Sequence, residues 1–250
     1  MIQSGHSAKG VPFYFKGEKM SVPYNTVVGE KNGKKYFECD WVYDLESYPN
    51  AFTMTIIHSS GKWLKSYEIS DRKNEIEELA KCLRFMVKNR QRMVGFNNLG
   101  YDYQLIHHII QHLADAKKSG KEPKLTAADL YALTMNIIAE MQVDGRSYGI
   151  RESEHFIKQV DLFKICHFDN KARMTSLKML EFNMRSDTVE DLPFPVGTVL
   201  NSDQIDVLLH YNGHDVLKTL QFYYYCFEAI MLRKELTEQF GFDCTNFNDT

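Results

Sequence analysis

The first part of the chain alternates short hydrophobic runs with turn-forming residues, which is the pattern of β-strands. Strands are expected over residues 41–45, 52–58 and 63–69. Pro49-Asn50 lies between the first two runs, and Ser59-Ser60-Gly61 lies between the second and third. Runs of this length that are bounded by turn residues are typical of consecutive strands.

After residue 70 the hydrophobic residues recur every three or four positions, which is the period of an amphipathic helix. Helices are expected over residues 71–89, 102–116, 126–141, 174–182 and 203–238, the last in one or two pieces. Asp71 is expected to cap the first of them. Short strands are expected at 93–96 and 156–165. Three strands followed by alternating helices and strands predict an α/β fold, with a mixed central sheet flanked by helices.

The region before residue 38 carries a turn signal of its own. Asn32-Gly33 lies between hydrophobic residues at 26–28 and 36–37, and an Asn-Gly pair in this setting predicts a β-hairpin. We therefore expect residues 1–37 to form a short N-terminal extension with a hairpin. Because no internal repeat or low-complexity linker interrupts the remainder, residues 38–250 are expected to form one domain.

The composition is typical of a globular protein. Hydrophobic residues make up 44% of the 250 residues, and charged residues make up 25%. The net charge is −3. Proteins that coat nucleic acid without sequence preference are usually basic, so this charge argues against that class.

Cysteine usage and hydrophobic runs bear on the cellular compartment. The five cysteines include no C-x-x-C pair, so free thiols in a reducing compartment are expected. No signal peptide is apparent at the N-terminus. No hydrophobic run reaches the roughly 18 residues that span a bilayer, and the longest candidate, residues 222–232, includes Glu228. We expect a cytoplasmic protein that makes no membrane contact.

Three short segments place carboxylates where they could share one site. Asp44 and Glu46 lie two apart in a predicted strand, so both side chains point to the same face. Tyr211 and Asp215 lie four apart in a predicted helix and also share a face. Asp102 begins another predicted helix. Four carboxylates held together repel one another unless cations neutralise them. Oxygen ligands suit Mg²⁺ or Mn²⁺, and two such ions about 3.5–4 Å apart can assist a phosphodiester displacement.

With these residues the chain resembles the DEDD exonucleases, in the branch that has a tyrosine in the third motif. The likeness is greatest to the 3′–5′ exonuclease domain of family B-type DNA polymerases, especially those of bacteriophages. The family motifs D-x-E, N-x3-[FY]-D and Y-x3-D are matched, in this order, by Asp44 and Glu46; Asn97, Tyr101 and Asp102; and Tyr211 and Asp215. Residues 175–178, Thr-Ser-Leu-Lys, are similar to the family's segment between the second and third motifs. The resemblance covers roughly residues 38–235 and implies a ribonuclease H-like exonuclease fold.

The resemblance also implies a role for each matched residue. Asp44 would bridge two metal ions, Mg²⁺ or Mn²⁺, and Glu46 and Asp215 would complete the site of the ion that activates water. Asp102 would help to hold the second ion through a bound water. Tyr211 would align the attacking water rather than deprotonate it, since a free phenol has a pKa of about 10. Contacts with the nucleic-acid strand are implied for Asn97, Leu45 and Tyr101.

The function implied by the resemblance is that of a metal-dependent 3′–5′ exonuclease, which releases nucleoside monophosphates from DNA. Its partner would be a single-stranded or frayed 3′ end. Proofreading beside a polymerase domain or subunit is one setting, and the host cytoplasm would be its location if a phage encodes it. Two alternatives stay open: an RNA exonuclease or oligoribonuclease of the same superfamily, and a non-catalytic nucleic-acid-binding module. Contacts to the 2′-OH separate RNA from DNA, and the sequence does not reveal them.

Several other residues could belong to a site or serve the structure alone. Asp161, on a predicted strand, is a rival acid for the site, and a structural hydrogen-bonding role is an equal alternative. His108 and His112 have the i, i+4 spacing of zinc ligands, but no third ligand is evident, so a plain histidine pair is expected. His214 is expected to be peripheral, because it points to a different face of its helix from Asp215.

Overall fold

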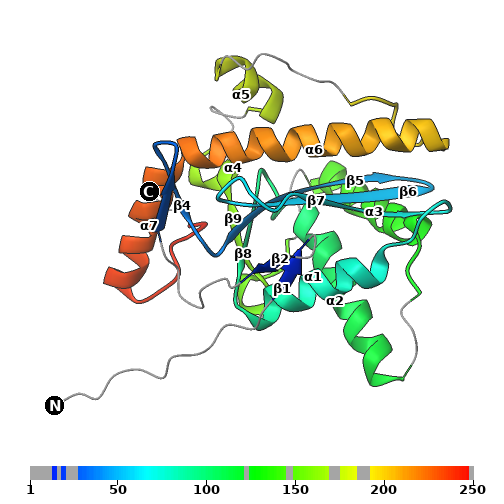
Figure 1. The fold of residues 1–250 in the computed structure, drawn as a ribbon, viewed down its shortest axis with the longest axis horizontal. Helices are drawn as coiled ribbons and strands as arrows, with labels where there is room; N and C mark the ends of the chain where they lie inside the picture. The colour runs from blue at the N-terminus through cyan, green and yellow to red at the C-terminus, as the bar shows by residue number, and fades with distance from the viewer. Residues whose placement is uncertain are drawn as a thin grey trace.

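The computed structural model describes residues 13–15, 18–20, 28–120, 124–144, 149–168, 175–184 and 192–247. Its centre is a five-stranded sheet with the strand order β7-β6-β5-β8-β9 (Figure 1). The strands are β5 Asp40–Tyr48, β6 Ala51–His58, β7 Lys65–Ser70, β8 Arg92–Gly95 and β9 Lys158–Asp161. The three consecutive strands and the two later ones that the hydrophobic pattern predicts all lie in this one sheet.

The sheet is mixed. Strands β5, β6 and β7 are antiparallel neighbours, whereas β8 runs parallel to β5 and β9 runs parallel to β8. In the register of β5 and β6, Asp44 pairs with Thr55 and Glu46 pairs with Thr53. This architecture confirms the expected α/β class and is consistent with a ribonuclease H-like fold.

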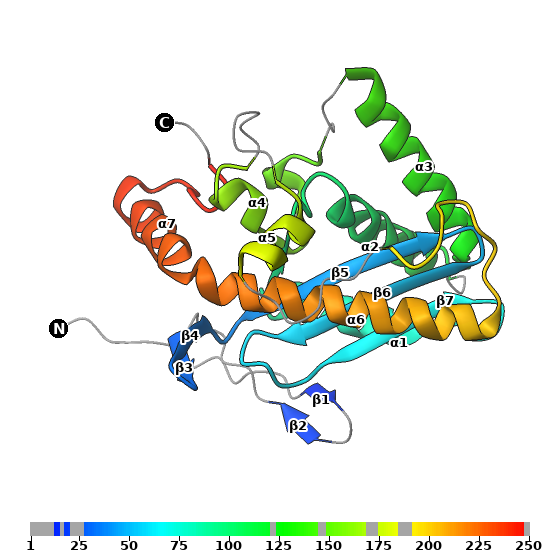
Figure 2. The same cartoon turned by 90° about the horizontal axis from the view of Figure 1, so that it is seen from above.

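Helices cover both faces of the sheet. They are α1 Ile76–Lys88, α2 Asp102–Lys118, α3 Ala127–Asp144, α4 Leu162–Ile165, α5 Leu177–Asn183, α6 Ser202–Tyr225 and α7 Phe227–Phe240, with a 3-10 turn at Glu152–Glu154. Helix α6 lies over β5 and β6 on one face, and α1, α2 and α3 lie on the other (Figures 1 and 2). Within the ranges that the structure covers, no helix is both long enough and apolar enough to cross a membrane.

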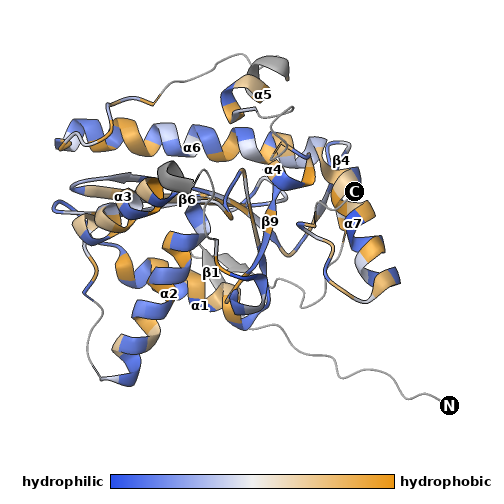
Figure 3. Ribbon diagram, turned by 180° about the vertical axis from the view of Figure 1, so that it is seen from behind, coloured by the Kyte–Doolittle hydropathy of each residue, from blue (hydrophilic) through white to orange (hydrophobic). Residues whose placement is uncertain are grey.

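The two faces of β5 carry different side chains. Three hydrophobic residues are buried in the core shared with α1, α2 and α3: Trp41, Tyr43 and Leu45. Val42 packs on the opposite face, in a second core with Val216 of α6. Because side chains alternate along a strand, Asp44 and Glu46 share the face of Val42 and point towards α6. Figure 3 shows that α6 carries both hydrophobic and hydrophilic residues along its length, as expected for a helix that buries one side.

The predicted N-terminal hairpin is present. Strands β3 Val28–Lys31 and β4 Lys34–Phe37 are antiparallel, and Asn32 and Gly33 connect them. The φ angles of these two residues are 53° and 72°, which suits the type I′ turn that an Asn-Gly pair favours.

The N-terminal extension also contains a second pair of short strands. Strands β1 Phe13–Phe15 and β2 Glu18–Met20 are antiparallel, and the hydrophobic pattern did not predict them. Residues 1–12, 16–17 and 21–27 of the extension lie outside the described residues. At its end, Phe37 is buried in the second core, and its backbone N–H donates to the hydroxyl of Tyr223 at 3.0 Å. The hairpin is thereby attached to α6.

The start of α1 differs from the prediction. The helix begins at Ile76, with Glu75 in the N-cap position. The segment before it folds back on β7, because the N–H of Glu75 donates to the carbonyl of Glu68 at 2.8 Å. Asn74 Oδ1 accepts a hydrogen bond from the N–H of Ile76 at 3.0 Å. Asp71 lies in an exposed bend before this segment, so the prediction that it caps the helix is wrong.

The strand predicted over residues 156–165 is shorter than expected. Strand β9 ends at Asp161, and the four-residue helix α4 follows directly. The Asp161 side chain accepts a hydrogen bond from the N–H of Phe163 at 3.0 Å, which caps that helix. A residue that caps a helix also ends the strand before it, so one hydrophobic run is divided between two elements.

Candidate active site

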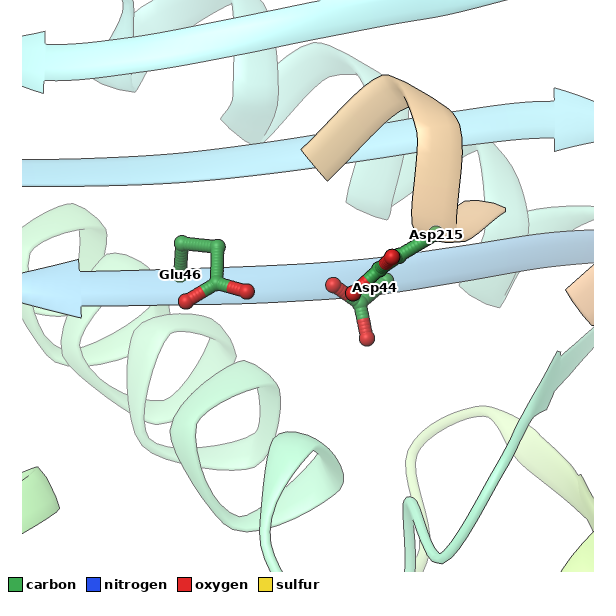
Figure 4. A group of neighbouring side chains, drawn as sticks. All are labelled: Asp44, Glu46 and Asp215. Carbon is green, nitrogen blue, oxygen red and sulfur yellow. The ribbon is translucent and has the colours of Figure 1, made fainter. Parts of the chain in front are cut away.

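Three carboxylates from distant parts of the chain meet beside the sheet. Asp44 and Glu46 project from β5, and Asp215 comes from α6 (Figure 4). Each offers an oxygen atom, and these atoms all lie within 4.8 Å of one another. All three residues are partly exposed, so an ion can reach them. Carboxylate oxygens are ligands that Mg²⁺ and Mn²⁺ prefer, and this donor set therefore fits such an ion.

The position of α6 brings Asp215 to the strand. The helix begins with a capping box, in which Asn201 and Gln204 satisfy each other's backbone N–H groups. Its inner side, which includes Leu208 and Val216, is buried and packs on β5 and β6. Asp215 lies beside Val216 and is thus held at the edge of this contact.

Tyr211 lies one turn before Asp215 and is 7% exposed. Burial raises the pKa of this phenol well above its usual range, and the negative charges of Asp215 and Glu46 raise it further. The hydroxyl also hydrogen-bonds to the Asp215 carboxylate. It therefore stays protonated and acts as a hydrogen-bond donor in the site.

Asp102 approaches the same region from the second motif. Strand β8 pairs with β5 only as far as Val42, and beyond that point the backbone N–H of Leu45 hydrogen-bonds to the Asp102 carboxylate. Burial raises the pKa of Asp102 to about 8, although this bond and one from its own backbone lower it. Asp102 is not among the three residues whose oxygens lie within 4.8 Å of one another. Its charge nevertheless raises the pKa of both Asp44 and Glu46, so it contributes to the negative potential of the site.

The acids disfavour one another's charged forms. Burial raises the pKa of Asp44 well above its usual range, and the charges of the neighbouring acids raise it further. Burial and the charges of Asp215 and Asp102 raise the pKa of Glu46 to about 8, while Lys178 lowers it. A divalent cation bound among these groups would remove the repulsion.

The raised pKa values predict how stability depends on pH when EDTA removes divalent ions. Glu46 and Asp102 hold their protons up to about pH 8 in the folded chain, whereas in the unfolded chain they lose them near pH 4. Their contribution to stability is therefore present below pH 4 and is lost as the pH rises through 8. We expect the free energy of unfolding to fall by at least about 1 kcal/mol more between pH 5 and pH 8.5 in the wild type than in Glu46→Gln. Urea denaturation at each pH measures the free energy of unfolding. An equal decrease in this free energy between pH 5 and pH 8.5 in the two proteins would contradict the prediction.

Asp161 organises the loop that precedes Asp102. Its carboxylate accepts hydrogen bonds from the backbone N–H groups of Asn97 at 2.9 Å and Leu99 at 3.3 Å. Asn97 has a φ angle of 59°, a region that residues other than glycine seldom adopt, so the loop needs this support. Burial raises the pKa of Asp161 to about 6, although its three backbone hydrogen bonds lower it. Of the two roles open to Asp161 on sequence, these contacts give it the structural one.

The three residues expected to contact a strand lie in different surroundings. Asn97 is exposed, and Tyr101 is partly buried, with its hydroxyl 3.1 Å from Thr134 Oγ1. Leu45 is 4% exposed and belongs to the core on the face of β5 opposite to Asp44. The expectation for the Leu45 side chain is therefore corrected, because residues one apart in a strand point to opposite faces.

Two residues near the carboxylates were not given a role on sequence. Asn212, between Tyr211 and Asp215 in the chain, donates from Nδ2 to Asp44 Oδ2 at 2.7 Å. Lys178 of α5 lowers the pKa of Glu46 through its charge. On sequence it belonged only to residues 175–178, which are similar to the exonuclease segment between the second and third motifs. A helical-wheel reading could have found Asn212, because it shares the buried side of α6 with Leu208 and Val216.

The rival residues lie outside the carboxylate cluster. The rings of His108 and His112 are 6.5 Å apart, and His108 is exposed. In the part of the chain that the structure covers, neither belongs to a group of three possible metal ligands. His214 is partly exposed and is also outside the group of three. The five cysteines, which all lie in the described part of the chain, form no disulfide.

Comparison of the sequence with protein-family models and with curated proteins found no match. Among solved structures, the chain is similar to the family B DNA polymerase from the hyperthermophilic archaeon Pyrobaculum calidifontis. The two are 17% identical, the match covers 75% of this chain and 24% of that chain, and the TM-score is 0.45. This chain thus corresponds to a minor part of the polymerase's length.

Proposed function

We propose that the protein is a divalent-metal-dependent 3′–5′ exonuclease that hydrolyses single-stranded DNA and releases nucleoside monophosphates. The observation that carries the proposal is the meeting of Asp44, Glu46 and Asp215, with oxygens within 4.8 Å of one another. These residues come from two of the three motifs by which the chain resembles the DEDD exonucleases. Asp102, from the remaining motif, is close enough for its charge to raise the pKa of Asp44.

The carboxylates would hold Mg²⁺ or Mn²⁺. Asp44, Glu46 and Asp215 would form the main donor set, and in this proposal Asp102 would help to hold a second ion. When bound, such ions stabilise the attacking and leaving oxygens of a phosphodiester displacement. The side chains of the protein would position the attacking water and the DNA strand.

Tyr211 and Asn97 supply positioning in this proposal. The protonated hydroxyl of Tyr211, whose one proton is donated to Asp215, would orient a water molecule by accepting a hydrogen bond from it. The exposed side chain of Asn97 is available to the terminal nucleotide, and Asp161 fixes the loop that presents it. Without a cation, Glu46 holds its proton up to about pH 8, and a divalent cation bound beside it would favour its charged form.

The proposed catalytic unit is residues 38–250, with residues 1–37 as an extension attached through Phe37. We further propose that the unit acts in the cytoplasm, either alone or beside a polymerase. Both settings use the same chemistry at the same site.

The proposal is tested by the polarity and the products of cleavage. With Mg²⁺, a single-stranded DNA oligonucleotide labelled at its 3′ end should release labelled mononucleotide from the first turnover. The same oligonucleotide labelled at its 5′ end should give a ladder that shortens one nucleotide at a time, and EDTA should stop both reactions. Internal cuts as the first products would refute an exonuclease.

A matched RNA oligonucleotide distinguishes the alternatives that remain. Faster release from RNA than from DNA would assign the protein to RNA processing. Metal-dependent binding of either strand without any release would indicate a non-catalytic module.

A further inference from the structure

The amide of Asn212 occupies an unusual position beside the carboxylates. Asn212 is 0% exposed and lies on the side of α6 that faces β5. Nδ2 donates to Asp44 Oδ2 at 2.7 Å. The other end of the same amide, Oδ1, is buried and has no hydrogen-bond partner among the described residues. The side chain is therefore satisfied only where it meets Asp44.

A buried carbonyl oxygen without a partner costs free energy. A leucine of similar size at this position would avoid that cost and would pack against the hydrophobic neighbours of α6. Stability alone thus does not explain an asparagine here. Active sites often keep residues that lower the stability of the fold because the activity depends on them.

The hydrogen bond to Asp44 provides a functional reason for the asparagine. A hydrogen bond to Oδ2 restricts the rotation of the carboxylate and leaves Oδ1 directed to other partners. The donor is neutral, so it holds the carboxylate without placing a positive charge where a cation would bind. Hydrogen-bond partners of metal-binding carboxylates orient these ligands in the same way, and their loss typically costs about 10–100-fold in metal affinity or activity.

We infer that Asn212 is a positioning residue, which orients the Asp44 carboxylate for divalent cations through its Nδ2 hydrogen bond. The inference rests on the proposed function, because it assigns Asp44 a cation to bind. It adds a residue at an unspecified position of the Y-x3-D motif, between Tyr211 and Asp215.

The test compares Asn212→Leu with the wild type in two measurements. Mn²⁺ affinity is measured by titration calorimetry, and the unfolding temperature is measured in EDTA. We expect Mn²⁺ to bind at least about tenfold more weakly to Asn212→Leu, while its unfolding temperature in EDTA is equal to or above that of the wild type. Thr219→Val is the matched control, since Thr219 is 1% exposed and lies two turns further along the same helix. It should bind Mn²⁺ as the wild type does.

Each other outcome has a defined meaning. Unchanged Mn²⁺ affinity in Asn212→Leu overturns the positioning role and leaves the exonuclease proposal standing. A wild type that binds Mn²⁺ but releases no nucleotide refutes the exonuclease, and the role of Asn212 is still decided by the affinities. A wild type that does not bind Mn²⁺ overturns both.

If Asn212→Leu does not fold, Asn212→Ser decides, because the serine hydroxyl is too short to replace the amide at Asp44. Weaker Mn²⁺ binding with an unchanged unfolding temperature in EDTA supports the role. A lower unfolding temperature without weaker binding overturns it.

Discussion

Replacing Asp44 with Asn is expected to lower the rate of mononucleotide release by about 10³-fold or more. A bound divalent cation contributes several kcal/mol to such a reaction, and each ~1.4 kcal/mol is a factor of ten in rate. The substitution preserves the shape of the side chain but removes the negative charge of Asp44. That charge belongs to the group of three carboxylates whose oxygens lie within 4.8 Å of one another. The rate is measured in single turnover with Mg²⁺ and a 3′-labelled oligonucleotide.

The same variant should keep its fold when divalent ions are absent. Burial and the neighbouring acids disfavour the charged form of Asp44, so Asn at this position relieves repulsion. We expect its unfolding temperature in EDTA to equal or exceed that of the wild type. Mn²⁺ should then raise the unfolding temperature of the wild type far more than that of the variant, because a ligand stabilises the state that binds it.

Asp115→Asn is the charge-matched control. The Asp115 side chain is 73% exposed and pairs with Lys118 on the surface of α2, so activity and the response to Mn²⁺ should stay at wild-type values. An Asp44→Asn protein that retains full activity would refute the metal site. One that unfolds far below the wild type in EDTA would show that Asp44 serves the fold instead.

Replacing Asp40 with Asn is expected to lower the free energy of unfolding by about 3–5 kcal/mol, the usual cost of breaking a buried ion pair from one side. Asp40 is 0% exposed and Arg92 is 8% exposed. The guanidinium of Arg92 binds both carboxylate oxygens, at 2.6 and 2.7 Å. The hydroxyl of Tyr223 donates to the same carboxylate at 2.9 Å. The substitution thus leaves a buried charge without its counterion.

This ion pair connects the elements that carry the site. Asp40 begins β5, Arg92 begins β8 and Tyr223 belongs to α6. Urea denaturation measures the loss, and Asp115→Asn again serves as the control, because an exposed pair contributes only about 0–1 kcal/mol. The double replacement of Asp40 by Leu and Arg92 by Met should recover much of the loss, since hydrophobic residues need no counterion. A cost below about 1 kcal/mol for Asp40→Asn would contradict the prediction.

Local patterns were sufficient wherever a short stretch of chain decides its own conformation. The Asn32-Gly33 turn is one case, because its φ angles follow from the two residue types themselves. The shared face of Asp44 and Glu46 is another, since alternation is a property of every strand. The mixed sheet follows from the order of these elements along the chain.

Local patterns failed where a contact with a distant residue decided the outcome. The late start of α1 depends on the hydrogen bond between Glu75 and Glu68 of the preceding strand. The early end of β9 depends on Asp161, whose carboxylate is also shared with the loop at Asn97. The burial of Leu45 reflects which of the two faces of β5 the helices α1, α2 and α3 cover.

The sequence by itself determined which acids could act together, because fixed spacings in a strand and in a helix place side chains on common faces. Only the tertiary structure decided that Asp44, Glu46 and Asp215 meet while Asp102 stands beside them, and that Asn212 holds one oxygen of Asp44. The physical reason is distance along the chain. The packing of α6 on β5 joins residues about 170 positions apart, and it depends on burying hydrophobic surface that no single segment contains.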